Sequence, residues 1–504
     1  MSQQTSLRQI LRSSSIVGGA SVLSIIFGIV RTKVAALLLG PAGVGLIGLY
    51  TNIMTTAATL AGLGFGNVGT RQIAEAAARE DTLAIAAARR ALFWGTLCLS
   101  LAGAAALWLL REPLARVLLS DASRADAVGW LALGVALTVG GASQAAVLNG
   151  LRRIGDLSRI SALGALLGTL AGIALLWRWG ERGLLAFVLA GPLASFLLGH
   201  LYVARLPKVR SPQTPLPELA RQWRRLIQLG AAFMLTALAG SLAHLLVRTP
   251  VQRESGVEAL GHFQAAWLIS MTYLGFVLQA MSADFYPRLT GVIHKHAEAN
   301  RVVNEQVEVA LLLAGPMLLA MLGLAPWVIE VLYTERFQPA VDVLRWQTLG
   351  DVLKVASWPL GFIILAAGDG RTYLASDCVG LAVLIALTWL GLPRLGVEAA
   401  GIAFLATYAV YLPLVYWLAR RRTGFRWAPA ARRQLLLLSG AGVAVLLAAR
   451  WNSLAGASCG VLLSAVFGLH ALGRLTELTN PGGALGRIGA TCRRALSRLW
   501  IHDE

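Results

Sequence analysis

Long apolar runs fill most of this sequence and recur about fourteen times between short polar connections. A helix rises 1.5 Å per residue, so about 20 apolar residues cross the hydrocarbon core of a bilayer. Hydrophobic residues make up 57% of the chain and charged residues only 14%, against roughly 25% charged residues in a soluble protein. The sequence therefore predicts an all-α polytopic membrane protein with about 14 transmembrane helices.

The predicted spans lie at about residues 14–38, 44–65, 91–110, 127–149, 160–177, 183–203, 226–248, 263–285, 306–333, 342–367, 373–392, 397–419, 435–449 and 454–472. Of the 44 Lys and Arg residues, 30 lie in the two tails and in the connections after every second span, and 11 lie in the alternate connections. Because basic residues collect on the cytoplasmic side, both termini are predicted to be cytoplasmic. The alternate connections are short, which leaves no room for an external catalytic domain.

The net charge of +19 indicates an anionic partner. The basic residues sit in short loops between apolar spans, which favours membrane lipid or a lipid-linked substrate over nucleic acid. The four cysteines lie far apart, and neither a G-x-x-x-x-G-K-[ST] loop nor an H-E-x-x-H motif occurs. We therefore expect no cofactor, no metal site and no nucleotide-hydrolysing domain. The N-terminal segment is expected to lead into a retained first span, because no small-residue cleavage site follows it.

A proline-rich segment divides the first twelve predicted spans into two groups of six. We predict an N-lobe over residues 1–203, a cytoplasmic linker over 204–225 and a C-lobe over 226–422. The rest of the chain is predicted to form spans 13 and 14, over 423–472, and a basic cytoplasmic tail, over 473–504.

A short internal match supports this division, because four residues in each lobe recur at the same spacing. They are Gly43, Val44, Gly48 and Tyr50 in the first lobe, and Gly256, Val257, Gly261 and Phe263 in the second, at an offset of 213 residues. Six spans per lobe predict parallel repeats related by a pseudo-two-fold axis along the membrane normal, with the substrate site between them. The same offset places Arg31 opposite His244.

The segment Trp346–Gly370 is long enough to cross a bilayer, yet it carries Asp351 and Lys354 in its interior. A charged residue at mid-membrane costs about 2.5–3.5 kcal/mol on insertion scales, so it normally faces a partner or a water-filled cavity. Gln347, Asp351 and Lys354 share one helix face, because residues three and four apart are neighbours. We interpret this face as the wall of a transport pathway. The alternative is an Asp351–Lys354 pair that neutralises itself and packs between helices.

Further cations lie within or at the ends of predicted spans. Arg31 and Lys33 follow too few apolar residues to have crossed, and the apolar run then resumes, so both lie inside the first span. Residues two apart cannot share a helix face, so we assign Arg31 to the cavity and Lys33 to an interface. Arg248 follows His244 by one turn and forms a second cationic stripe, with snorkelling of Arg248 and plain packing of His244 as the alternatives. His244 and Asp351 are the candidates for coupling to an ion.

Several stretches resemble the lipid-linked oligosaccharide flippases, the O-antigen and enterobacterial common antigen translocases. These stretches are the WQxxGDVLK run from Trp346 to Lys354, Gly361, Gly396-Val397 with Gly401, Arg420–Arg422, Arg31-Thr-Lys33, Leu38-Leu-Gly40-Pro41-Ala-Gly43-Val44-Gly45, and Gly62 to Arg71. The family forms the polysaccharide transporter branch of the multidrug/oligosaccharidyl-lipid/polysaccharide exporter (MOP) superfamily. The resemblance covers about residues 14–422, and spans 13 and 14 depart from the usual pattern of near twelve spans.

This resemblance implies that the chain moves an undecaprenyl-pyrophosphate-linked oligosaccharide repeat unit from the cytoplasmic to the periplasmic leaflet of the bacterial inner membrane. It implies alternating access of two lobes without a chemical reaction, and a polysaccharide polymerase and a chain-length regulator as partners. Arg31, Arg248 and Lys354, with Trp346 and Gln347, are the candidates for contacting the substrate, because a pyrophosphate needs cationic groups to replace water. Without a nucleotide motif, the energy has to come from an ion gradient, of H+ or Na+, or from substrate flux.

Two other classes of protein remain as alternatives. A multidrug or cation-coupled exporter of the same fold would need an acidic cavity suited to cationic drugs, which the basic bias of the spans disfavours. A membrane glycosyltransferase or polymerase would need a large external loop for its active site, and the predicted outside loops are too short for one.

Overall fold

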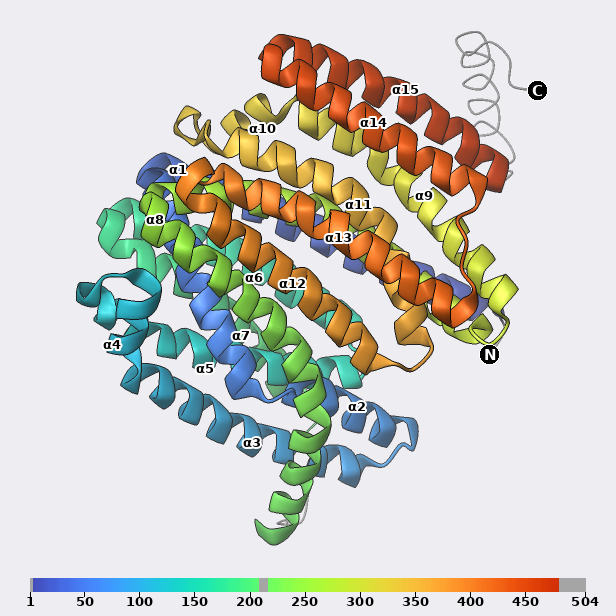
Figure 1. The fold of residues 1–504 in the computed structure, drawn as a ribbon. Helices are drawn as coiled ribbons and strands as arrows, with labels where there is room; N and C mark the ends of the chain where they lie inside the picture. Colours follow the sequence, from blue (N-terminus) through green and yellow to red (C-terminus); the bar gives the residue numbers. More distant parts are fainter. Residues whose placement is uncertain (1–2, 208–215, 480–504) are drawn as a thin grey trace. The chain divides into compact units, whose positions relative to one another are not determined.

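The computed structural model describes residues 3–207 and 216–479, and every regular element in these ranges is a helix (Figure 1). The long helices are α1 (Gln3–Gly62), α2 (Phe65–Ala78), α3 (Thr82–Leu109), α5 (Ala125–Gly150), α6 (Ile154–Trp179), α7 (Leu184–Ala204), α8 (Leu216–Val292), α9 (His296–Gly323), α11 (Ala340–Ala366), α12 (Gly370–Leu395), α13 (Glu398–Thr423), α14 (Pro429–Trp451) and α15 (Ser453–Thr479). Short helical segments are α4 (Arg111–Leu114), η1 (Ala115–Leu119), η2 (Ala122–Arg124), η3 (Gly180–Gly183), α10 (Ala325–Leu332) and η4 (Glu335–Phe337). The predicted all-α class is confirmed.

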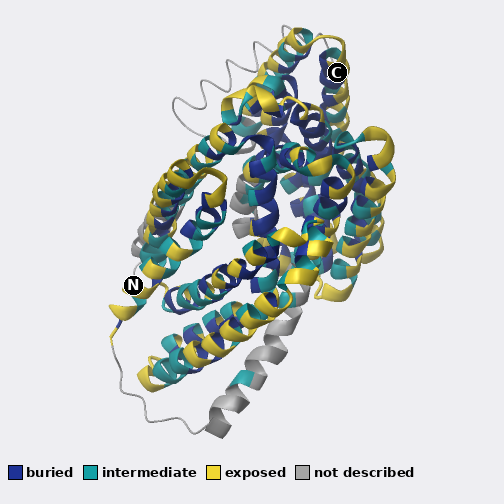
Figure 2. Ribbon diagram, turned by 90° about the vertical axis from the view of Figure 1, so that its left-hand side faces the viewer, coloured by how far each residue is buried: buried dark blue, intermediate teal, exposed yellow. Residues whose placement is uncertain are grey.

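Ten helical segments within the described residues are long and apolar enough to cross a membrane. Two of them, 18–62 and 154–204, have 45 and 51 residues, more than twice the length of about 20 residues that one crossing needs. Many large apolar side chains are exposed, among them Trp451 at 87% and Leu109 at 79%. Figure 2 marks the exposed stretches of the helices in yellow. Such surfaces suit lipid rather than water, so the chain is a multi-pass membrane protein. The number of about 14 spans stays a prediction.

Two of the long helices contain a sharp bend at a glycine. Gly40 in α1 and Gly256 in α8 have φ values of 64° and 88°, which side chains other than glycine rarely adopt. Pro41 follows the first bend and cannot donate a backbone hydrogen bond. The predicted repeat pairs Gly43 with Gly256, whereas the bends pair Gly40 with Gly256, a shift of three residues in the match.

The same shift pairs Gly45 with Gly261, and the structure brings these two glycines to one helix crossing. A Cβ atom added to Gly45 would lie 2.8 Å from the Val257 carbonyl oxygen, and one added to Gly261 would overlap the Pro41 carbonyl oxygen. The two contacts are equivalent under exchange of the repeats, because Pro41 and Val257 stand in the same positions before the paired glycines. Small residues therefore let the backbones approach closely where α1 and α8 cross.

The described chain packs into two compact units, unit 1 up to Gly261 and unit 2 from His262. The predicted lobes divide instead at the linker, and that division stays a prediction. The part of α8 up to Gly261 belongs to unit 1, to which two sets of hydrogen bonds join it. At one end Trp223 Nε1 donates to the Ala91 carbonyl of α3 at 2.9 Å.

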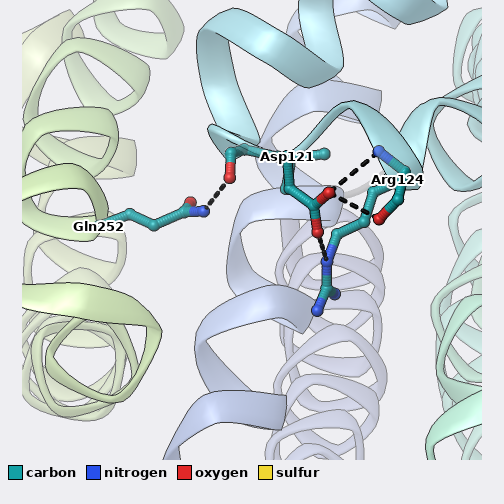
Figure 3. Close-up of polar contacts among 5 residues, drawn as sticks. Asp121, Arg124 and Gln252 are labelled. Atoms are coloured by element: carbon teal, nitrogen blue, oxygen red, sulfur yellow. Dashed lines mark hydrogen bonds and ion pairs between the residues drawn. The ribbon is translucent and has the colours of Figure 1, made fainter.

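A second set of bonds fastens α8 to unit 1 further along the helix. Gln252 Nε2 donates to the Leu119 carbonyl at 2.6 Å (Figure 3), and Arg253 Nη2 donates to the Val117 carbonyl at 2.5 Å. Both acceptors lie at the C-terminal end of η1, where a helix has no partners of its own for its last carbonyl groups. Asp121 lies two residues after the end of η1. Its Oδ1 atom accepts hydrogen bonds from the Ser123 backbone N–H at 2.9 Å and from the Ser123 hydroxyl at 2.6 Å.

Unit 2 is built around α11, which packs against α9, α13 and α14. Most of its side chains are buried, including the polar ones described below. The hairpin α14–α15 lies beside α9 (Figure 1). The backbones meet closely at Gly323 and Gly460, and Ser464 Oγ donates to the Pro316 carbonyl at 2.7 Å. Spans 13 and 14, which depart from the usual family pattern, are therefore an integral part of unit 2.

Three predicted boundaries differ from the observed ones. The linker predicted at 204–225 overlaps α8, which begins at Leu216, because Pro217 is tolerated in the first turn of a helix. The ninth span predicted at 306–333 is two helices, since the chain turns at Leu324 before α10. The tail predicted at 473–504 begins as part of α15, and its residues from 480 onward lie outside the described residues.

Candidate functional site

Asp351 is the most deeply buried charged side chain of the predicted stripe, with 0% of its surface exposed. One carboxylate oxygen, Oδ2, accepts hydrogen bonds from the Ser270 hydroxyl and the Tyr273 hydroxyl of α8, each at 2.7 Å. The other oxygen, Oδ1, is buried without a hydrogen-bond partner. A buried carboxylate needs such donors in place of water, and the open Oδ1 leaves it able to bind one more donor or a cation.

Lys354 follows Asp351 by three residues and is held by a different kind of contact. Its Nζ lies 3.4 Å from the Met271 sulfur, 5.5 Å from the centroid of the Phe404 ring and 5.7 Å from that of Tyr408. Aromatic faces attract a cation through their quadrupole without neutralising its charge. No carboxylate of the described chain forms an ion pair with Lys354. Asp351, three residues earlier, still interacts with Lys354 through its charge, so the alternative in which the two groups neutralise each other stays a prediction beside the pathway wall.

Gln347 lies one turn before Asp351 on the same face, and it too is 0% exposed. Neither its amide oxygen nor its amide nitrogen has a hydrogen-bond partner. Leaving a buried polar group unpaired costs about 1–3 kcal/mol, so such a residue calls for a ligand or a functional explanation. Gln347 and the Oδ1 atom of Asp351 thus form one unsatisfied polar strip along α11.

Trp346 lies on another side of α11 and has partners of its own. Its indole N–H donates to Glu398 Oε1 at 2.7 Å, and Arg450 Nη2 donates to the same oxygen at 2.5 Å. The Arg450 guanidinium also lies 5.2 Å from the centroid of the Trp346 ring. In this structure Trp346 joins α11 to α13 and α14, whereas its predicted role in substrate binding stays a prediction.

A second carboxylate, the half-buried Asp377 of α12, lies in the same unit. The Tyr411 hydroxyl of α13 donates to Asp377 Oδ1 at 2.7 Å. The Tyr411 ring contacts the Tyr408 ring at 6.1 Å between centroids, and Tyr408 in turn faces Lys354. A continuous set of tyrosines and charged groups therefore runs through unit 2 from Asp377 to Asp351.

Arg31 lies on α1 in unit 1, where it contacts α7. Its Nη2 donates to the Phe187 carbonyl, and its guanidinium lies 4.3 Å from the centroid of the Phe187 ring. An added Cβ at Gly191 would come within 3.1 Å of Nη1, so the glycine leaves room for the guanidinium. Arg31 thus connects α1 to α7 in this structure. Its contact with substrate stays a prediction.

The predicted site residues fall into two groups. Arg31, the half-buried His244 and the buried Arg248 belong to unit 1, and Trp346, Gln347, Asp351 and Lys354 belong to unit 2. Within unit 2 the structure brings Gln347, Asp351 and Lys354 onto one face of α11, as the sequence predicts. Within the described residues, no group of three or more His, Cys, Asp or Glu side chains is arranged to hold a metal ion.

Sequence reasoning missed the residues that surround Asp351 and Lys354. Ser270 and Tyr273 lie 81 and 78 residues before Asp351, and Phe404 and Tyr408 lie on α13. The one local sequence feature that could have indicated these residues is a tyrosine inside an apolar span, as at Tyr273 and Tyr408. Tyrosine hydroxyls buried among apolar residues usually find a partner, but such tyrosines are too common in membrane helices to single these out.

The fold is shared with solved membrane transporters. An inward-facing multidrug resistance MATE family transporter of the MOP superfamily aligns over 81% of this chain and 98% of its own, with a TM-score of 0.67 and 15% identity. The lipid II flippase MurJ, in an inward closed conformation, aligns over 90% of this chain and 97% of its own, with a TM-score of 0.68 and 12% identity. The chain is thus a polytopic membrane protein with the fold of these solved transporters.

Within that class, the chain belongs to the polysaccharide biosynthesis protein family, which matches residues 34–342. The lipid III flippase of Escherichia coli strain K12 is 26% identical over 410 residues, which are 78% of this chain and 95% of the flippase. The lipid III flippase of Shigella flexneri matches equally well. These relatives are transporters rather than enzymes, and the predicted family is confirmed.

Proposed function

We propose that this protein is a flippase that moves an undecaprenyl-pyrophosphate-linked oligosaccharide from the cytoplasmic to the periplasmic leaflet of the bacterial inner membrane. The similarity to lipid III flippases over 95% of their length supports a lipid-linked precursor as the substrate. The predicted orientation, with both termini in the cytoplasm, and an O-antigen repeat as the sugar belong to the same proposal. So do a polysaccharide polymerase and a chain-length regulator as partners.

The observation that carries the proposal is the set of contacts around the Lys354 ammonium group. It lies inside a membrane helix, is held by a sulfur atom and two aromatic rings, and forms no ion pair with a described carboxylate. A cation in low dielectric with no carboxylate in direct contact attracts a further anionic group strongly. A pyrophosphate supplies that charge, and lysine is a common phosphate ligand. Gln347 lies about two helical turns before Lys354, and its unpaired amide supplies a neutral donor and acceptor suited to sugar hydroxyls.

Asp351 is proposed to couple transport to an ion, with H+ and Na+ as the two candidates. Its Oδ1 atom has no partner, while Oδ2 is fixed by Ser270 and Tyr273. A fixed carboxylate with one open oxygen can take up a proton or contribute one ligand to a small cation. Replacing the Na+ gradient by a proton gradient of equal size distinguishes the two ions, and Asp351→Asn should remove the dependence on either.

The test is the sidedness of a lipid-linked oligosaccharide in proteoliposomes, scored by its accessibility to an added glycosidase. Lys354→Ala should slow the protein-dependent exposure by at least about tenfold, the effect of losing one hydrogen bond between charged groups. Lys354→Arg should keep part of the activity. The matched control is Lys295→Ala, since Lys295 is exposed at the α8–α9 connection and pairs with Glu298 at 3.7 Å.

Two results would overturn the proposal. Full activity of Lys354→Ala at equal protein level would remove the lysine from the pathway. Failure to expose any lipid-linked oligosaccharide, together with efflux of a cationic dye, would move the protein to the alternative class, a multidrug exporter of the same fold. The MATE transporter shares the fold, but a lysine with no carboxylate in direct contact repels a cationic drug.

A further inference from the structure

The connection between α13 and α14, residues 424–428, is held rigidly against α9. Asn304 Oδ1 accepts from the Ala428 backbone N–H at 2.7 Å, and Asn304 Nδ2 donates to the Arg426 carbonyl at 3.0 Å. Just before the connection, the Thr423 hydroxyl donates to Asn300 Oδ1 at 2.7 Å. Because backbone groups are fixed on both sides, this turn has one defined conformation.

Aromatic packing fixes the inside of the same turn. Phe425 is fully buried, and Trp427 stacks on Tyr416 of α13 with an interplanar angle of 8°. The ring of Phe425 also meets Trp427 edge-on at 5.3 Å between centroids. The side chains that point inward thus anchor the turn, and those that point outward are presented from a rigid base.

The side chains that point outward are arginines. Six exposed arginines lie within residues 420–433, namely Arg420, Arg421, Arg422, Arg426, Arg432 and Arg433. Arg422 pairs with Asp369, but none of the other five forms an ion pair with a carboxylate of the described chain. Neighbouring acidic residues of α9 are already occupied, since Glu305 pairs with Arg301 and Glu308 with Arg474. The turn therefore presents a dense, unneutralised positive charge.

Helix stability explains only part of this charge. The arginines at the end of α13 lie at the negative end of the helix dipole and stabilise that helix. Arg432 and Arg433 lie near the start of α14, where the dipole is positive and a cation is unfavourable. This start also has no side-chain cap and no acidic residue in its first turn. The local arrangement opposes folding and favours an anion from outside the chain.

The residues next to these arginines indicate what kind of anion binds. Leu436 and Leu437 follow Arg432 and Arg433 by four residues each, so each leucine lies on the same helix face as its arginine. Their exposed fractions are 64% and 40%. On α13, Arg421 lies over Trp417, with 3.8 Å between the guanidinium carbon and the ring centroid. On both helices, each of these arginines therefore lies one turn from an exposed apolar side chain. An interface with lipid requires this combination of charged and apolar surface.

We infer that residues 420–433 form a binding surface for the phosphate headgroup of an anionic phospholipid at the end of the bundle predicted to face the cytoplasm. The guanidinium groups of Arg426, Arg432 and Arg433 bind the phosphate oxygens, in the bidentate geometry that arginine favours. An acyl chain then lies along Leu436 and Leu437. The surface is separate from the stripe on α11 and does not depend on what the protein transports.

The experiment titrates the purified full-length protein with phosphatidylglycerol or phosphatidylcholine and counts bound lipids by native mass spectrometry. The wild type should retain phosphatidylglycerol in preference to phosphatidylcholine. Arg432→Gln with Arg433→Gln should weaken phosphatidylglycerol binding by at least about tenfold. The control is Arg79→Gln with Arg152→Gln, two exposed arginines of unit 1 that form no ion pair with a described carboxylate.

Four results would overturn the inference. Equal losses in the test and control pairs would mean that only total charge matters, and no preference for phosphatidylglycerol in the wild type would mean that the surface does not select an anion. Displacement of the lipid by inorganic phosphate at the same concentration would exclude an acyl contact. Displacement of bound phosphatidylglycerol by undecaprenyl pyrophosphate at a much lower concentration would make the surface a substrate site. Folding of the test pair is checked in phosphatidylcholine, where its thermal midpoint should not fall, because two cations leave the positive end of α14.

Discussion

The bond between Gln252 of α8 and the end of η1 offers the sharpest test of how unit 1 is held together. Gln252 is 6% exposed, and its Nε2 donates to the Leu119 carbonyl at 2.6 Å, while its amide oxygen has no partner. Gln252→Leu keeps most of the volume and removes the donor. It also removes the unpaired oxygen, so the net loss is expected near the lower end for a buried hydrogen bond, about 1 kcal/mol.

A loss of this size is measurable if the bond exists in only one conformation of the protein. About 1 kcal/mol changes the ratio of two populations roughly fivefold. Spin labels on cysteines replacing Ala122 and Glu254, both exposed, report the separation of α8 from this loop by pulsed electron resonance. In Gln252→Leu the share of molecules at the shorter separation should fall about fivefold relative to the remainder.

The matched control is Thr290→Val, which removes a hydrogen bond of 2.8 Å to the Tyr286 carbonyl within α8 itself. It joins no second element, so the distance distribution should stay as in the wild type. An unchanged distribution in Gln252→Leu, accompanied by a lower thermal midpoint, would refute the reasoning. The bond would then be present in every conformation and would contribute only to stability.

Three further outcomes are expected. Gly261→Val forces a side chain against the Pro41 carbonyl and should lower stability by about 1–3 kcal/mol, whereas Gly240→Ala, where an added Cβ meets nothing within 4 Å, should not; equal thermal midpoints would contradict the close crossing. Hydrogen bonds from the Ser123 side chain and backbone lower the pKa of Asp121, so the ionised form stabilises the fold at neutral pH. The stability difference from Asp121→Asn should begin to shrink as the pH falls below about 4 and should vanish once the pH is below the lowered pKa of Asp121; a difference that stays constant through this acid range would contradict the assignment. Asn304→Ala should loosen the turn before α14 by about 2 kcal/mol, seen as faster proteolysis at residues 424–428, and unchanged cleavage would argue against the fastening.

The sequence predicts the helical class and singles out α11 for one physical reason. A charged residue inside a long apolar run is expensive in a membrane, so Asp351 and Lys354 stand out without any knowledge of their surroundings. Helical spacing then places Gln347 on the same face, and the structure agrees. Spacing does not reveal the contacts of Trp346, because Glu398 and Arg450 reach it from helices far along the chain.

Contacts between distant helices and the ends of helices are what the sequence does not reveal. The donors to Asp351 come from α8, and no local pattern marks Ser270 or Tyr273 among the other hydroxyl residues of the spans. Apolar composition continues unbroken from α9 into α10, so hydropathy alone joins them, although the chain turns at Leu324 before the proline of the next helix. The bends at Gly40 and Gly256 are a property of the backbone conformation. A comparison of residue identities between the two repeats does not detect them, so the predicted alignment of the repeats is shifted by three residues from the alignment of the bends.

Unit 1 uses the same type of contact several times: a side chain of one helix bonds to a backbone carbonyl of another. Trp223, Gln252 and Arg31 are donors of this kind. Every residue offers a carbonyl, so the accepting positions, such as Leu119, are free to change their side chains without losing the bond. The donors have no such freedom. Among relatives, the accepting positions should therefore vary in residue type, whereas the donor positions should be conserved. An alignment would then show no covariation between donor and acceptor positions, even though the residues are in contact.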